Sequence, residues 1–173
     1  MKTSEARTYL VNIPSLKNGH HEFDFEIRDS FFESFEDSLV TKGNGHCRMD
    51  LKKTETMMTM DFEFDLGVEL VCDRSLDTFT FPIKEKHELI VKFGEHDEEL
   101  SEDLLVISRE TQTFDTAPIL YELINLAIPM KKLHPRYDGQ ESPDLIYQTE
   151  ITEDEGEEEI DPRWAELKKL SNK

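Results

Sequence analysis

Residues 57–72, MMTMDFEFDLGVELVC, decide the fold of this chain. Every even position from Met58 to Cys72 is apolar, and many of the odd positions carry acids. Alternation with a period of two is typical of a strand, or a bent pair of strands, with one buried face and one solvated face. The stretch therefore predicts the centre of an antiparallel sheet, with Gly67 as a candidate bulge or bend.

Further stretches share this period or have a strand-like composition. They are residues 7–13, 21–27, 46–52, 78–93 and 104–107. Residues 78–93 are long enough for one strand or two, and Pro82 within them indicates an edge or a bend, because proline cannot donate to a ladder. The sequence thus predicts several strands on both sides of the central one.

Two helices are expected between these strands. Asp29 and Ser30 open a short one, in which Ser30 and Glu33 have the spacing of a capping box. Its apolar face is formed by Phe31, Phe32, Phe35 and Leu39. Asp115 and Thr116 begin the second helix, which tolerates Pro118 in its first turn and ends at Pro129. Its apolar stripe consists of Ile119, Leu120, Leu123, Ile124 and Ala127.

The composition changes after Gly139. Residues 150–159, EITEDEGEEE, carry seven acids in ten positions and little that could be buried, which predicts a disordered tether. Asp161 then suits a helix N-cap, Pro162 suits the first turn, and Trp164, Leu167 and Leu170 share one side. We therefore expect an α+β domain with a largely antiparallel sheet over 1–140, an acidic linker over 141–160 and a C-terminal helix over 161–173.

The net charge of −19 limits the classes of partner. Nucleic-acid binding draws most of its affinity from cations that displace counterions, so strong autonomous RNA or DNA binding is disfavoured. A basic protein partner fits the charge better, although the acidity could serve solubility alone. The chain shows no signal peptide h-region and no run long enough to span a bilayer, so we expect a cytoplasmic monomer with two free thiols.

Metal and thiol chemistry have few candidate residues. Cys72 and His134 could approach each other, but a structural zinc site needs four nitrogen or sulfur ligands, and Ser75 stands where a C-x-x-C pair would close. Cys72 could equally be a small buried hydrophobe. Cys47 lies between His46 and Arg48, which point to the other face of the strand. No common catalytic motif is present, so we expect no enzyme activity, no cofactor and no bound metal.

Two features are candidates for partner contact. Arg74 follows the long strand, and it could make a specific contact or pair with Asp73 or Asp77 at the surface. A three-turn helix is unstable alone in water, so the C-terminal helix must dock on its own sheet or in the groove of a partner. The contact residues expected there are Asp161, Pro162, Arg163, Trp164 and Leu167.

Three motifs resemble the YceD-like family, the large ribosomal RNA subunit accumulation proteins of bacteria and plastids. The first is a strand running into C-x-R-C and then Phe, matched here by Cys72, Asp73, Arg74, Ser75 and Phe79. The second is a helix ending in an L-A-L-P-like stretch before a His or Cys cluster, matched by Leu126, Ala127, Ile128, Pro129 and His134. The third is a D-P-R or N-P-F helix rich in Leu and Lys, matched by Asp161, Pro162, Arg163, Trp164, Leu167 and Leu170.

The resemblance covers roughly residues 45–173 and implies a non-enzymatic role in making or stabilising the large ribosomal subunit. Ser75 replaces the second cysteine, and the cysteine that commonly follows the histidine is missing, so the ligand set is degenerate here. With the acidity, this implies contact with a basic ribosomal protein or a pre-ribosomal particle. Two other hypotheses stay open: a metal- or thiol-dependent enzyme built on Cys72 and His134, and a general acidic protein-interaction module.

Overall fold

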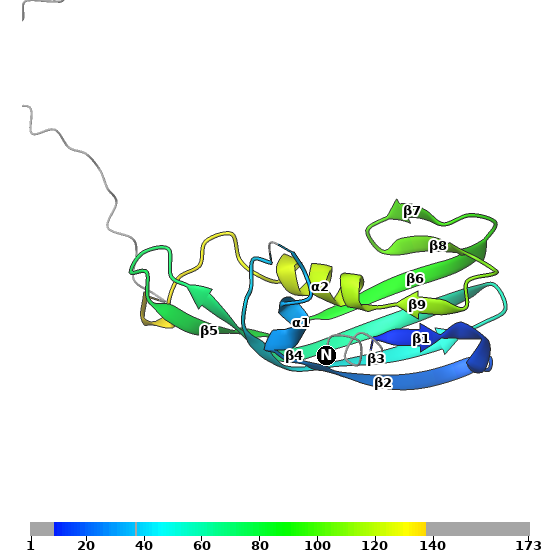
Figure 1. The fold of residues 1–173 in the computed structure, drawn as a ribbon, viewed down its shortest axis with the longest axis horizontal. Coiled ribbons are helices and arrows are strands. Elements are labelled where there is room, and N and C mark those ends of the chain that lie inside the picture. Colours follow the sequence, from blue (N-terminus) through cyan, green and yellow to red (C-terminus); the bar gives the residue numbers. More distant parts are fainter. Residues whose placement is uncertain (1–8, 37, 138–173) are drawn as a thin grey trace, which may run out of the picture. The chain divides into compact units, whose positions relative to one another are not determined.

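The structure of the protein is a computed structural model that describes residues 9–36 and 38–137 (Figure 1). The predicted acidic linker and C-terminal helix, with Asp161, Pro162, Arg163, Trp164 and Leu167, lie outside these residues. Within the described part, the chain is rich in strands and its sheet is mostly antiparallel, as predicted. No helix of the described part is long and apolar enough to cross a membrane.

The centre of the sheet is the pair β3 (Gly43–Lys53) and β4 (Met57–Val71). Their register places apolar side chains opposite one another: Cys47 with Phe64, Met49 with Phe62 and Leu51 with Met60. All six side chains are buried, whereas the acids at the odd positions of β4 are exposed. The predicted alternation of residues 57–72 is confirmed over its whole length.

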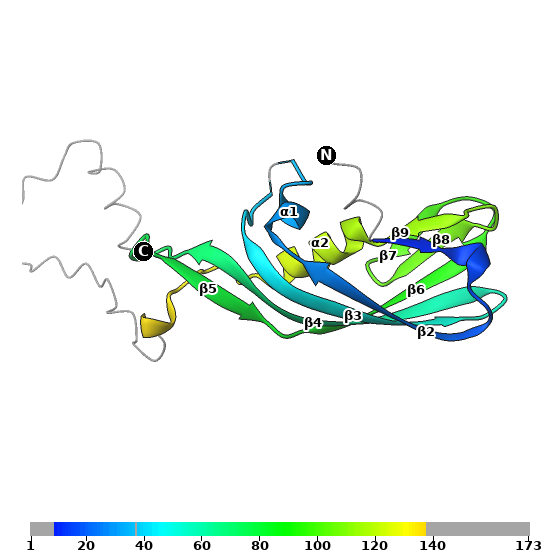
Figure 2. The same ribbon diagram turned by 60° about the horizontal axis from the view of Figure 1, so that its bottom comes forward.

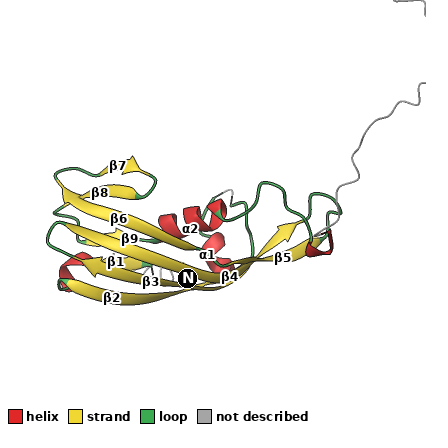
Figure 3. Cartoon of the chain, turned by 180° about the vertical axis from the view of Figure 1, so that it is seen from behind, coloured by secondary structure: helices red, strands yellow, loops and turns green. Residues whose placement is uncertain are grey.

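Five more strands extend this pair into a seven-stranded sheet. They are β2 (Gly19–Ile27), β5 (Thr78–Ile83), β6 (Lys86–Gly94), β7 (Glu98–Ser101) and β8 (Leu104–Ser108). The order is β2-β3-β4-β6-β8-β7, with β5 attached to β4 (Figure 3). All pairs are antiparallel except β6 with β8, which is parallel.

Strand β4 changes partner along its length. Its first part pairs with β6 as far as Glu63, and its last part pairs with β5 from Leu66 to Val71. Gly67 stays in register with both β3 and β5, so the prediction of a bulge at this residue is wrong. The glycine is needed for space, because a Cβ at this position would lie 2.8 Å from Cγ2 of Thr80. β5 pairs only with β4, which confirms the edge expected from Pro82.

The inner face of the sheet is covered by two helices and a two-stranded ribbon (Figures 1 and 2). The helices are α1 (Asp29–Phe32) and α2 (Ala117–Leu126), and the ribbon pairs β1 (Leu10–Asn12) with β9 (Thr113–Asp115). Two short 3-10 helices, Ile13–Ser15 and Pro135–Tyr137, complete the described elements. Leu120 and Ile124 of α2 are fully buried against the sheet.

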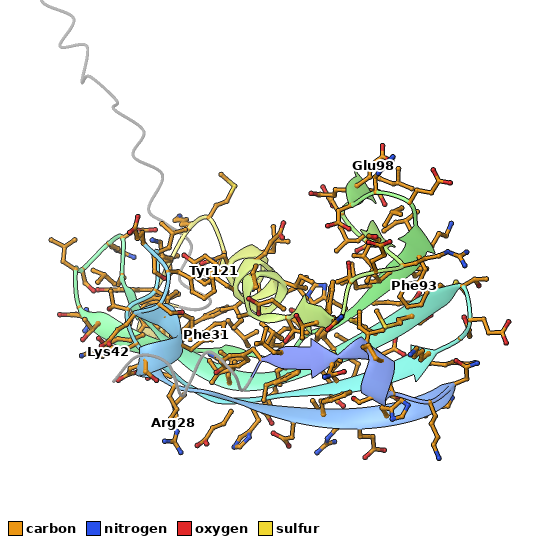
Figure 4. The ribbon with its side chains drawn as sticks, turned by 45° about the vertical axis from the view of Figure 1, so that its right-hand side comes forward. Arg28, Phe31, Lys42, Phe93, Glu98 and Tyr121 are labelled. Carbon is orange, nitrogen blue, oxygen red and sulfur yellow. The ribbon has the colours of Figure 1, made fainter. Side chains whose placement is uncertain are left out.

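Helix α1 differs from its prediction. It ends at Phe32, and the residue at its N-cap is Arg28, so Ser30 lies inside the helix and not at its cap. Leu39 was expected on the apolar face, but it lies in the following loop with 77% of its surface exposed. Phe35 still reaches the interior by stacking on Tyr121 at 4.0 Å, close to Phe31 (Figure 4). The aromatic contacts therefore hold a loop after Phe32 against the core, in place of the longer helix that was predicted.

The start of α2 agrees with the sequence in part. The Asp115 carboxylate accepts the N–H of Ala117 at 3.0 Å, which is the expected acidic cap. The Thr116 hydroxyl instead donates to the backbone oxygen of Tyr9 at 2.8 Å. That bond joins α2 to the residue before β1, so the cap also connects distant parts of the chain.

Candidate functional site

The turn after β4 holds the residues that the sequence singled out. The N–H of Cys72 donates to the oxygen of Asp77 at 2.9 Å, and the N–H of Leu76 donates back to the oxygen of Cys72 at the same distance. Leu76 has φ of 61°, an uncommon left-handed conformation for a residue with a side chain. These contacts close a tight hairpin between β4 and β5.

The segment after α2 returns to this hairpin and is held there by its backbone. The N–H of Asp73 donates to the oxygen of Lys132 at 2.8 Å, and the N–H of Lys132 donates to the Asp73 carboxylate at 2.7 Å. The N–H of His134 donates to Sγ of Cys72 at 3.3 Å. Residues 72–77 and 127–137 therefore form one local unit at the β5 end of the sheet (Figure 1).

The thiol of Cys72 lies in a cradle of hydrogen-bond donors. Burial raises its pKa, but the hydroxyl of Ser75 and the N–H groups of Ser75, His134 and Arg74 lower it, and the result is about 7. Cys47 lacks such a cradle, and burial together with the charge of Asp24 raises its pKa to about 12. The hairpin thus favours the thiolate form of Cys72, whereas the surroundings of Cys47 in β3 favour the neutral thiol.

The structure brings Cys72 and His134 together, but not as a pair of metal ligands. The contact to Cys72 is the backbone N–H of His134, while its ring packs on Phe79 at 5.5 Å and its Nδ1 accepts the N–H of Arg136. No group of three or more His, Cys, Asp or Glu side chains within the described ranges could hold a metal ion. The donor set here is therefore too small for the four-ligand site of structural zinc.

Ser75 occupies the position of the missing cysteine. Its Oγ is buried and forms no hydrogen bond of normal geometry within the described residues. It lies near enough to Cys72 and Asp77 to lower the pKa of both groups. The hydroxyl thus lies near both the Cys72 thiol and the Asp77 carboxylate, at the position where a C-x-x-C pair would close.

Two guanidinium groups lie over the ring of Tyr137 in this unit. The guanidinium carbon of Arg74 is 4.6 Å from the ring centroid, and that of Arg136 is 4.9 Å from it. Arg136 also pairs with the Asp77 carboxylate, whose pKa is lowered by Ser75, by Arg136 and by the charge of His134. Asp77 is therefore the partner of Arg136, and Arg74 stacks on an aromatic ring.

The same end of the molecule is rich in cations. Residues 123–137 contain no Asp or Glu, and they contribute Lys131, Lys132 and Arg136. Together with Arg74, these side chains form what we call the basic hairpin end. Leu76 and Met130 lie in its two segments with 76% and 102% of their surfaces exposed, so this end also carries apolar side chains in contact with solvent.

The opposite end of the sheet is acidic. Six exposed acids lie between the end of β6 and the start of β8, and we call them the acidic corner: Glu95, Asp97, Glu98, Glu99, Glu102 and Asp103. β7 passes through this corner as the edge strand of the sheet, and all four of its residues are exposed (Figure 4 labels Glu98). The run of acids was visible in the sequence, but its location at a free edge was not.

The outer face of the sheet is different from both ends, because it carries charges of both signs and several of them pair with each other. Lys86 contacts Glu63 at 3.0 Å and thereby lowers the pKa of that carboxyl group. Similar pairs join Lys84 to Asp65 and Lys42 to Glu69. Two open hollows on this face share Arg48, Glu63 and Lys86 in their linings, so they present a mixture of signs.

Comparison with known proteins gives one match. A family model described as "Large ribosomal RNA subunit accumulation protein YceD" matches residues 60–171, which is more than half of the chain. The match includes most of β4, the acidic corner and the basic hairpin end. No curated protein and no solved structure matches.

Proposed function

The chain belongs to the YceD family, and on that premise we propose that it is a non-enzymatic factor in the accumulation of the large ribosomal RNA subunit. It acts by binding a basic ribosomal protein, either free or on a pre-ribosomal particle. The expected cytoplasmic location and monomeric state belong to this proposal.

The acidic corner is the observation that supports this partner best. Its six carboxylates are exposed and lie in and beside an edge strand, and only Asp97 is engaged by a hydrogen bond within the described residues, from the N–H of Ser108 at 2.7 Å. Complementary charge accelerates encounter and excludes partners of the same sign. A basic protein surface is the complement that this corner selects.

A role in binding, not catalysis, is supported by the surroundings of Cys72. A reactive thiolate needs access and a base that takes its proton. Cys72 is fully buried, and its contact to His134 is a backbone N–H that donates. This arrangement stabilises the hairpin and offers no route for a substrate.

Arg74 and the segment that contains Asp161, Pro162, Arg163, Trp164 and Leu167 remain proposed partner contacts. Arg74 is exposed at the tip of the hairpin, where its stacking on Tyr137 holds the guanidinium in one place. Residues 161–167 fall within the family match. We expect their aromatic and apolar side chains to anchor the partner.

The test is a strain that lacks the gene. Sedimentation of its ribosomes should show reduced large subunits, and the abundance of large-subunit ribosomal RNA should fall. Pulldown with cross-linking and mass spectrometry should recover basic ribosomal proteins, with cross-links from the acidic corner. Unaltered large-subunit and ribosomal RNA levels would refute the role and favour a general acidic interaction module.

A thiol- or metal-dependent enzyme is the second candidate, and the lowered pKa of Cys72 is the observation that favours it. Elemental analysis of the purified full chain separates the two. Stoichiometric zinc would revive the enzyme hypothesis, and its residues would be Cys72 and His134.

A further inference from the structure

We propose that the basic hairpin end is a contact site for the phosphate backbone of a single-stranded RNA segment. The inference rests on the proposed function, because it gives the pre-ribosomal particle a second point of attachment. The acidic corner then holds a basic protein while the hairpin touches RNA.

The cations of this end are available to an external anion. Asp77 is occupied by Arg136, and Asp73 accepts the backbone N–H of Lys132. None of the ion pairs among residues 9–36 and 38–137 involves Arg74, Lys131 or Lys132. On the outer face, Lys42, Lys84 and Lys86 are paired with acids, whereas Lys52 and Lys92 are exposed and form no ion pair among the described residues. The hairpin end differs from that face because its two acids, Asp73 and Asp77, are both engaged, while several cations lie close together in its two segments.

The geometry of Arg74 suits phosphate better than a mobile lysine would. A guanidinium group that stacks on an aromatic ring keeps its N–H donors in a fixed plane, and this fork matches two phosphate oxygens. Tyr137 is itself held in place, because its N–H donates to the oxygen of His134 at 2.9 Å. The hydrogen bonds around Cys72 thus position the groups that would meet RNA.

The two exposed apolar side chains add a second kind of contact. Leu76 lies in the same turn as Arg74, and Met130 precedes Lys131. Phosphate contacts position a nucleic acid, whereas unstacked bases need apolar or aromatic surfaces beside those contacts. Cations next to exposed apolar groups therefore favour single-stranded RNA over a uniform polyanion.

The acidic corner does not forbid this contact, because its six carboxylates lie far from the hairpin along the sheet. β4 has 15 residues, and a strand rises about 3.3 Å per residue, so it spans about 50 Å. Lys92 near the end of β6 pairs with Met57, so the acidic corner lies near one end of β4, while the basic hairpin end follows its other end. At about 0.15 M salt the Debye length is about 8 Å, so the acidic corner is screened from the hairpin.

The experiment uses the full chain and a labelled single-stranded RNA of about 12 nucleotides, with fluorescence anisotropy between about 50 and 150 mM salt. The test variant is Lys131→Gln/Lys132→Gln. The matched control, Lys52→Gln/Lys92→Gln, removes the same charge from two exposed lysines of β3 and β6. We expect the test variant to bind RNA about 10-fold more weakly and its salt slope to fall by about 1.4, while the control changes less than about 2-fold.

Arg74→Lys tests the role of the stacked fork, because it keeps the charge but loses the planar group. It should weaken RNA binding several-fold, and Arg74→Gln should weaken it further. Equal losses in Lys131→Gln/Lys132→Gln and in its control would overturn the inference, as would equal affinity for a polyglutamate peptide. Absence of RNA binding by the unaltered chain at low salt would overturn it as well.

Capture of basic ribosomal proteins distinguishes the two proposals. If RNA binding fails and this capture persists, only the RNA site is wrong. If the capture fails and RNA binding is tight, the proposed function is wrong in its choice of partner.

Discussion

The acidic corner and the basic hairpin end belong to one sheet, but they are built in different ways. The corner consists of a short edge strand whose residues are all exposed, and few side-chain hydrogen bonds hold it. The hairpin end is fastened by backbone hydrogen bonds from Cys72, Asp73 and Leu76, of which the one from Asp73 reaches the segment after α2. Two more bonds come back from that segment, from the N–H groups of Lys132 and His134 to the side chains of Asp73 and Cys72. If the corner binds a partner as proposed, we therefore expect it to act through its charge, whereas the hairpin presents groups in fixed positions.

The largest expected effect comes from the strand that joins both regions. Phe62 is buried at the centre of β4 opposite Met49, so Phe62→Ala should lower the free energy of unfolding by about 3–5 kcal/mol. Urea denaturation followed by circular dichroism measures this. Phe81→Ala, at a half-buried position of β5, should cost less. Equal costs would show that Phe81 is packed as closely as Phe62, contrary to its half-buried position.

The next prediction compares the hairpin with the central sheet through the ionisation of their two cysteines. At pH 7 about half of Cys72 is thiolate, because its pKa is about 7, whereas the pKa of Cys47 is about 12. In Cys47→Ala, the ultraviolet absorbance of the Cys72 thiolate should therefore rise as the pH passes through about 7, a measurement that needs no access to the buried side chain. In Cys72→Ala, the thiolate absorbance of Cys47 should rise only toward pH 12. Ionisation of both thiols in the same pH range would refute the donor cradle.

The same pKa gives a prediction about stability. The folded pKa of Cys72 lies below the ordinary value of 9.0, so the thiolate stabilises the fold above pH 9, and this contribution is lost as the pH falls through about 7. The melting temperature of the unaltered chain should thus rise between pH 7 and 9 relative to Cys72→Ala. Cys47→Ala keeps Cys72, so its melting temperature should show the same rise relative to Cys72→Ala over this range.

A smaller effect is expected at the acidic corner. Glu98→Lys/Glu99→Lys should weaken capture of a basic ribosomal protein by about 10-fold, mostly through slower association. Glu33→Lys/Glu36→Lys is the matched control, because it makes the same charge change at exposed positions near α1. Biolayer interferometry measures both. Equal losses would mean that net charge, and not this corner, selects the partner.

The smallest effect concerns the ring that orients the arginines. Tyr137→Ala removes the surface under Arg74 and Arg136 and should weaken RNA binding by about two- to fivefold. Tyr137→Phe keeps the ring and should restore most of the binding. If both substitutions weaken binding equally, the hydroxyl and not the ring is the important group.

The sequence predicted the parts of the fold that follow from a strong period. The alternation in β3 and β4 placed every buried side chain correctly, because both strands are long and have one apolar face. β7 was missed, since its four exposed residues do not alternate, and β9 was missed because only Phe114 of its three residues is apolar. The predicted cap at Ser30 failed because the helix has only four residues and is held by aromatic packing.

The candidate site was predictable in its members but not in its contacts. The motif residues Cys72, Arg74 and His134 do meet in the structure. Their contacts depend on the backbone N–H of His134 and on the ring of Tyr137, both far from the turn in sequence. No sequence motif indicates either contact. The acidic corner could have been found from its run of six acids, because a charge run is visible without any knowledge of contacts.

The order of the last three strands has a consequence for self-association. β8 lies between β6 and β7, so β7 is left with one side of its backbone unpaired at the rim of the sheet. Such rims template the addition of another chain, and like charges are a common defence. A second copy that docked there would bring its own carboxylates against those of the first. We therefore expect the negative side chains that are proposed to attract a basic partner also to oppose edge-to-edge addition of a second copy.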